Sequence, residues 1–140
     1  MIIIHCPHCA KANRLPIDRL SQMPICGACK KDLLSLPIIA NRKNYQELTS
    51  QPGLPVIVDF WAPWCEPCKT FSSTFEASAM RYANKVLHLK INTETEQAIS
   101  QQFQIRSIPT LIGFSRGQER SRISGALPAK QLEQIIARLI

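Results

Sequence analysis

The spacing of six cysteines constrains this chain more than any other feature of its sequence. In a secreted protein, six cysteines would indicate a framework of disulfide bonds. In a reducing compartment, metal binding or redox catalysis is the better interpretation. Spacing and context must decide between these two, because the cysteines fall into three Cys-x-x-Cys pairs: Cys6/Cys9, Cys26/Cys29 and Cys65/Cys68.

The first two pairs have the spacing of a zinc site. Sixteen residues separate Cys9 from Cys26, and two Cys-x-x-Cys turns at this spacing can direct four sulfurs at one ion. A segment of about 35 residues with few large apolar side chains is too small to fold alone, and a metal would supply the missing free energy. We therefore expect one structural Zn²⁺ per chain, bound by Cys6, Cys9, Cys26 and Cys29, with no need for His5 or His8. An iron site and two redox disulfides remain as alternatives.

The third pair follows an apolar run, Pro55 to Trp61, and precedes a predicted helix. A cysteine at a helix N-terminus faces free backbone N–H groups and the positive end of the helix dipole, which favour the thiolate. We expect Cys65 to have a lowered pKa and to act as the nucleophile. Cys68, one turn further along, would be the resolving thiol, and Pro67 restrains the turn. A third metal knuckle or two buried thiols are the alternatives.

Asp59 interrupts that apolar run. Burial of a carboxyl group raises its pKa, so Asp59 could accept a proton from Cys68. A solvated position at the strand end is the alternative. Lys90, at the end of the next predicted strand, could pair with Asp59, or could be a solvated lysine. Pro109 precedes a strand, where a cis peptide bond is possible and a trans turn is more common.

Strand and helix signals alternate from about residue 37 and predict an α/β fold with a mixed central sheet and helices on both sides. Pro37 marks the boundary, so we expect a zinc-ribbon-like module over 1–35 and a second domain over 36–140. Strands are expected at 38–40, 55–61, 86–91, 110–114 and 121–125. Helices are expected at 41–49, 65–82, 95–103 and from 128 onward.

These residues together resemble the thioredoxin family, over about residues 37–140. The shared pattern is Trp64-Cys65-Glu66-Pro67-Cys68-Lys69, the preceding Asp59, and Ile108-Pro109-Thr110. The resemblance implies the thioredoxin fold, a protein-disulfide reductase without a bound organic cofactor, and recharging by thioredoxin reductase. It also implies a cis Pro109 and a docking surface for disulfide-containing client proteins, formed by Trp64, Pro67, Ile108, Pro109, Gly125 and Ala126. Glu66 stands where the family usually has Gly, and we expect it to raise the pKa of Cys65 slightly.

A zinc-ribbon-like segment ahead of such a domain is similar to the zinc-containing thioredoxins of bacteria, the thioredoxin 2 type. A zinc-dependent redox sensor or holdase is the main alternative function. A disulfide oxidase is a further one, which a cytoplasmic location disfavours. The net charge of +7 is spread over the chain, with +3 in residues 1–40 and +4 in residues 41–140, so we expect no nucleic-acid partner. Without a long apolar stretch or a signal sequence, we expect a cytoplasmic monomer that does not bind membranes.

Overall fold

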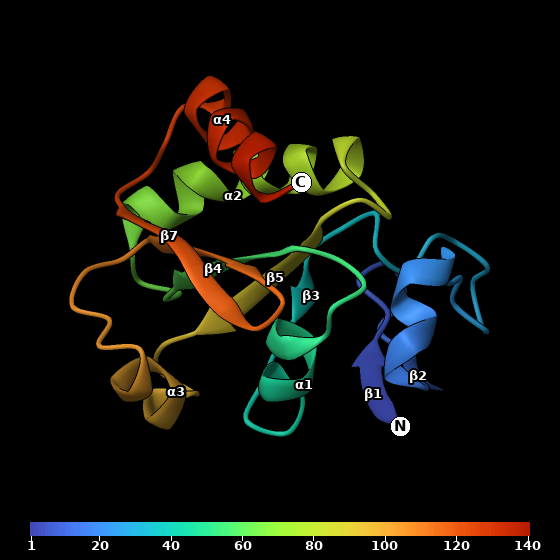
Figure 1. The fold of residues 1–140 in the computed structure, drawn as a ribbon. Coiled ribbons are helices and arrows are strands. Elements are labelled where there is room, and N and C mark those ends of the chain that lie inside the picture. Colours follow the sequence, from blue (N-terminus) through green and yellow to red (C-terminus); the bar gives the residue numbers. More distant parts are fainter.

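The computed structural model describes residues 1–140 and contains two sheets. The N-terminal sheet is a hairpin in which β1 (Ile2–His5) and β2 (Ala12–Leu15) pair antiparallel, and a short 3₁₀ helix, η1 (Ile17–Gln22), follows it. The hairpin and η1, in blue in Figure 1, lie beside the larger sheet, near β3 and α1. This segment carries the first four cysteines, so the chain places them at one side of the molecule.

The second sheet has five strands in the order β3-β5-β4-β6-β7 and is mixed, as predicted. The strands β3 and β4 run parallel to β5, whereas β6 is antiparallel to β4 and to β7. The central position of β4 explains its nearly continuous apolar sequence, because both faces of a central strand are covered. The five strands are β3 (Ile38–Ile39), β4 (Val56–Trp61), β5 (Leu87–Asn92), β6 (Thr110–Ser115) and β7 (Gln118–Ser124).

Four helices cover the two faces of this sheet. The helices α2 and α4 lie on one face, and α1 and α3 lie on the other (Figure 1). None of the helices is both long and apolar enough to cross a membrane. The helices are α1 (Tyr45–Ser50), α2 (Glu66–Arg81), α3 (Gln97–Gln102) and α4 (Ala129–Leu139).

Two predicted boundaries differ from the structure by three residues or more. The helix expected from residue 41 begins at Tyr45, because Asn41 and Asn44 form a turn in which the Asn44 side-chain oxygen accepts from the Asn41 N–H at 2.9 Å. The strand expected from residue 121 begins at Gln118. Arg116 and Gly117 both have positive φ, of 52° and 77°, and this two-residue turn lets pairing resume at once.

The N-terminal segment shares its core with the larger sheet. Ile4 and Leu20 have no exposed surface, and they belong to one continuous cluster with Ile38 of β3 and Val58 of β4. A separate cluster on the other face joins Ile57 to apolar side chains of α2 and α4. The N-terminal segment and the larger sheet are therefore packed against each other, while the division at residue 35 stays a prediction.

Candidate active site and metal centre

Cys65 and Cys68 lie where β4 leads into α2. Cys65 is the N-cap of α2, with an extended backbone, and its sulfur accepts a hydrogen bond from the Cys68 N–H at 3.2 Å. The two sulfurs are joined as a disulfide. Both residues are almost fully covered in this oxidised form, with 4% and 3% of their surface exposed. Pro67 is the second residue of α2, where its missing N–H costs no helical hydrogen bond.

The loop that precedes β6 faces the disulfide. The Ile108–Pro109 peptide bond is cis, and the Ile108 carbonyl oxygen lies 3.6 Å from the Cys65 sulfur. Pro109 in turn accepts a hydrogen bond from the Gly125 N–H at 2.8 Å. Gly125 has a φ of 104°, which favours glycine, and a Cβ there would meet no atom within 4 Å. The surface above the backbone at Gly125 is therefore open.

Trp64 and Ala126, the other two residues expected in the docking surface, are both exposed. Trp64 keeps 64% of its surface exposed, although it directly precedes Cys65. Its indole N–H donates to Glu94 Oε1 at 2.7 Å. Glu94 is a residue that sequence reasoning missed, since no local pattern connects a strand-end carboxylate to a tryptophan thirty positions earlier.

Asp59 is completely buried beneath α2. It lies on the same face of β4 as Ile57, whose side chain packs in the cluster that contains Phe71 and Phe75 of α2. Neither carboxyl oxygen has a hydrogen-bond partner. Burial raises the pKa of Asp59 to about 7, and the positive charge of Lys90 limits that rise. A buried carboxyl group with such a pKa can exchange protons at neutral pH.

Lys90 is the register neighbour of Asp59 on β5, but the direct ion pair considered from the sequence is absent. Its ammonium group instead donates to Ser72 Oγ at 3.2 Å and lies 4.7 Å from the centre of the Trp61 ring. A hollow of about 280 Å³ opens there, lined by Trp61, Cys68, Lys69, Ser72 and Lys90. Sequence reasoning missed Ser72, although it stands one turn after Cys68 on the same helix.

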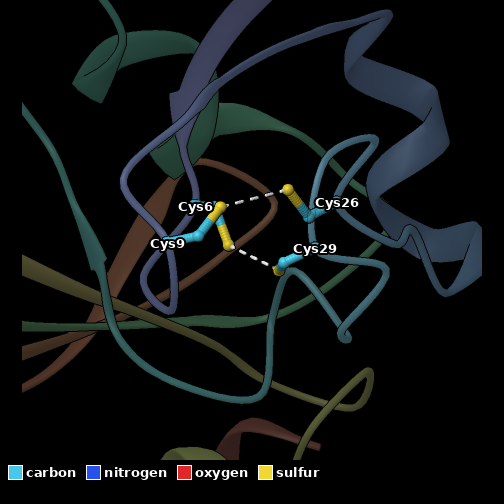
Figure 2. A group of neighbouring side chains, drawn as sticks. All are labelled: Cys6, Cys9, Cys26 and Cys29. Carbon is cyan, nitrogen blue, oxygen red and sulfur yellow. Dashed lines mark hydrogen bonds between the residues drawn. The ribbon is translucent and has the colours of Figure 1, made fainter.

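The four N-terminal cysteines converge on one point (Figure 2). Their sulfurs all lie within 4.8 Å of one another. The Cys6–Cys29 and Cys9–Cys26 sulfur pairs are each 3.7 Å apart. A tetrahedral site with Zn–S bonds of about 2.3 Å has sulfur–sulfur edges of about 3.8 Å. The cluster therefore has the dimensions of a four-sulfur metal site.

Matching backbone turns hold the two Cys-x-x-Cys pairs. The Cys6 N–H donates to the Lys11 carbonyl at 2.9 Å, and the Cys26 N–H donates to the Lys31 carbonyl at the same distance. The residue that follows each pair, Ala10 or Lys30, has a φ of 68° or 65°. The two knuckles are thus close structural copies, which brings four sulfurs to one centre from two sides.

Hydrogen bonds to sulfur favour the thiolate form of Cys26 in this cluster. The His8 N–H donates to the Cys6 sulfur at 3.3 Å, and the Asn13 amide donates to the Cys26 sulfur at 3.4 Å. Backbone N–H groups of Cys29 and Ala28 act with Asn13 to lower the pKa of Cys26 to about 5. The pKa of Cys9 shifts the other way, because the backbone hydrogen bond at Lys11, which lowers it, is outweighed by burial and by contacts with the other three sulfurs, which raise it to about 11. A metal ligand must be a thiolate, so these bonds suit a metal site.

The two nearby histidines have other partners. The His8 Nε2 atom is 2.8 Å from Ser35 Oγ, and the His5 Nδ1 atom is 3.2 Å from the Ala10 carbonyl oxygen. The structure therefore gathers the four cysteines into one cluster that could hold a metal ion, and both histidines have hydrogen-bond partners outside it.

Comparison with known proteins finds two family models in this chain. The model described as "Thioredoxin" matches residues 37–138, and the model described as "Thioredoxin 2, N-terminal", a zinc ribbon, matches residues 5–31. "Thioredoxin C-3" of Corynebacterium nephridii is 41% identical over 134 residues, which cover 95% of this chain and 92% of that protein. "Thioredoxin" of Porphyra purpurea is 42% identical over 107 residues, which cover 76% of this chain and 99% of that protein.

Two solved thioredoxin structures are similar to this chain. A thioredoxin from Malassezia sympodialis superposes with a TM-score of 0.66 at 28% identity, covering 72% of this chain and 88% of that chain. A mutant thioredoxin from Halobacterium salinarum NRC-1 has a TM-score of 0.69 at 24% identity, over 76% and 92% of the two chains, and supports the fold alone.

Proposed function

Because this chain belongs to the thioredoxin family, and is a thiol–disulfide oxidoreductase that acts as a protein-disulfide reductase, we propose a specific assignment of roles within its active site. Cys65 is the nucleophile, Cys68 is the resolving thiol, and Asp59 is the group that moves the proton. The placement of Cys65 at the N-cap of α2, with a backbone N–H 3.2 Å from its sulfur, is the observation that carries the assignment.

In the first step, the Cys65 thiolate attacks one sulfur of a client disulfide. A mixed disulfide forms between Cys65 and the client, and the other client sulfur leaves as a thiolate that takes a proton from water. The Cys68 N–H and the N-terminus of α2 stabilise the negative charge on Cys65 before the attack. Both electrons that reduce the client come from the dithiol of the protein.

In the second step, Cys68 releases the client. The Cys68 thiol gives its proton to the Asp59 carboxylate, and the resulting thiolate attacks the Cys65 sulfur. The Cys65–Cys68 disulfide forms while the bond between Cys65 and the client breaks, so the second client thiolate leaves. Thioredoxin reductase, using NADPH, then returns two electrons to the pair. The buried position of Asp59 and its pKa of about 7 support this role.

The client docks on the surface around the disulfide. Trp64 supplies an exposed aromatic ring, and the open backbone at Gly125 leaves room for an extended segment beside Cys65. The exposed Pro67 and Ala126, the half-buried Ile108 and the buried Pro109 complete this surface. Lys90 acts on Asp59 through its charge, since the two side chains form no direct bond.

The metal in the four-cysteine site is one structural Zn²⁺ per chain. When bound, it supplies cross-linking of the two knuckles and takes no part in electron transfer. The thiolate-favouring hydrogen bonds and the tetrahedral dimensions support zinc, which accepts four sulfur ligands in this geometry. A cluster of reduced thiolates also suits a reducing compartment, and we place the protein in the cytoplasm as a monomer.

An insulin-reduction assay with NADPH and thioredoxin reductase tests the proposal. The native protein should be active, the Cys65→Ser variant inactive, and each should contain about one zinc ion per chain. Full activity of Cys65→Ser would overturn the assigned nucleophile. Loss of zinc from Cys65→Ser would mean that the third cysteine pair serves the metal.

A further inference from the structure

The ammonium group of Lys90 is held by a short chain of side chains on α2. Lys90 Nζ donates to Ser72 Oγ at 3.2 Å, and Ser72 Oγ donates onward to Glu76 Oε1 at 3.5 Å. The same ammonium group lies over the Trp61 ring, at 4.7 Å from its centre. Ser72 is thus the only hydroxyl that accepts a hydrogen bond from Lys90, and it joins Lys90 to a carboxylate on the surface of the helix.

This arrangement stands next to the buried carboxyl group of the active site. Lys90 is the register neighbour of Asp59, and its side chain lines the hollow of about 280 Å³ that also contains Cys68. Leu111, the register neighbour of Asp59 on the other side, brings no charge. His88 shares the face of β5 with Lys90, but its ring nitrogens are engaged by Ser78 and by the Val86 carbonyl. On α2, Cys68 and Lys69 line the same hollow as Lys90, and the Lys69 ammonium group is paired with Glu66 at 3.1 Å. Of the cations around the hollow, Lys90 is the one whose charge limits the rise in the pKa of Asp59.

We propose that Ser72 is a positioning residue that holds the Lys90 ammonium group in the hollow beside Cys68, and so sets the protonation of Asp59 while the Cys65–Cys68 disulfide closes. The inference rests on the proposed role of Asp59 in that step. Ser72 does not touch the reacting sulfurs, and it acts through Lys90 alone.

Loss of the Ser72 hydroxyl should let the ammonium group move outward. An ammonium group is strongly hydrated, and Glu76 is exposed on the outer side, so both water and this carboxylate attract Lys90 away from the sheet. Asp59 then loses part of the positive charge that favours its ionised form. We expect its pKa to rise by about half a unit in Ser72→Ala.

The rise has a consequence for catalysis near neutral pH. With a native pKa of about 7, roughly half of the Asp59 groups are ionised at pH 7. A pKa half a unit higher leaves about a quarter ionised, so the closing step should be about twofold slower at that pH. The rates of the two proteins should converge at high pH, where Asp59 is ionised in both.

The test is an NMR titration of the Asp59 carboxyl carbon in the reduced, zinc-loaded protein. It compares native protein with Ser72→Ala, with Ser72→Thr, which keeps the hydroxyl, and with Ser73→Ala, which removes the neighbouring exposed serine. The pH profile of disulfide closure, followed after mixing reduced protein with excess glutathione disulfide, provides the second readout. Ser72→Ala should raise the pKa of Asp59 and move the pH profile of closure to higher pH, whereas Ser72→Thr and Ser73→Ala should behave as native protein.

A Lys90→Met background tests whether Ser72 acts on Asp59 through Lys90. The substitution Ser72→Ala should have no further effect on Asp59 there, because the cation it positions is gone. An unchanged or lowered pKa of Asp59 in Ser72→Ala would overturn the inference. So would a pKa shift of equal size when Ser72→Ala is added to Lys90→Met. The Asp59→Asn variant separates the two proposals: if closure keeps its native pH profile in that variant, the role of Asp59 fails, whatever Ser72 does to its pKa.

Discussion

Replacement of Asp59 by Asn should stabilise this protein, and the gain should grow as the pH rises. Asp59 is fully buried without a hydrogen-bond partner, and burial raises its pKa from an ordinary 3.8 to about 7. Between these two values the unfolded chain ionises at Asp59 while the folded protein keeps the proton. The free energy of unfolding of the native protein therefore falls as the pH rises through this window, and it levels off above about pH 7.

The size of the effect follows from the two pKa values. Their difference is slightly more than three units, which corresponds to about 4 kcal/mol at 1.36 kcal/mol per unit. Asn resembles the neutral carboxyl group and does not ionise. The advantage of Asp59→Asn should be about 2 kcal/mol at pH 5.5 and about 4 kcal/mol at pH 8.5, so it should widen by about 2 kcal/mol.

Guanidinium chloride unfolding of the oxidised, metal-loaded protein measures this difference. The range from pH 5.5 to pH 8.5 avoids the strongly acidic conditions that protonate metal-binding thiolates. The Asp18→Asn variant is the matched control, since Asp18 is exposed on η1, and its stability should follow native protein at each pH. A constant gap between Asp59→Asn and native protein, or a less stable variant at pH 8.5, would refute the reasoning. Either result would mean that Asp59 is ionised or hydrogen-bonded in the fold.

Three further predictions concern other parts of the molecule. His88 is buried, and burial lowers its pKa to about 4, so the stability that its neutral ring contributes is fully present above about pH 6.5 and is lost as the pH falls. The free energy of unfolding of native protein should therefore fall by about 2 kcal/mol more than that of His88→Gln between pH 7 and pH 5, as measured by denaturant unfolding. Glu66 is paired with Lys69 at 3.1 Å and its side chain is 82% exposed, so solvent screens its charge. The substitution Glu66→Gly should therefore lower the pKa of Cys65, measured by thiolate absorbance, by less than about half a unit. A larger shift would contradict the expected screening. Removal of the metal with a chelator should lower the melting temperature of the whole chain, because the ribbon shares a core with the larger sheet; an unchanged calorimetric transition would show that the ribbon adds nothing to the stability of the rest.

The parts of the site that depend on local spacing could be predicted from the sequence. A Cys-x-x-Cys turn places two sulfurs on one side of a single turn of backbone, so two such turns with a suitable interval specify a four-sulfur site. Likewise, the change from an apolar strand to a helix places Cys65 at a helix N-terminus. Asp59 could be recognised because a carboxyl group inside an apolar run is rare without a function. These features follow from chain geometry within a few residues, and the structure contains each of them.

Contacts between distant segments were decided only by the tertiary structure. The sequence suggested Lys90 as a partner of Asp59, and strand register does set them side by side, yet packing of α2 provides Ser72 and leaves Asp59 unpaired. The bond from Trp64 to Glu94 had no sequence signal either. The physical reason is that such contacts depend on the orientation and position in which each helix packs on the sheet. That placement results from the summed packing of many side chains, and no short stretch of sequence contains it.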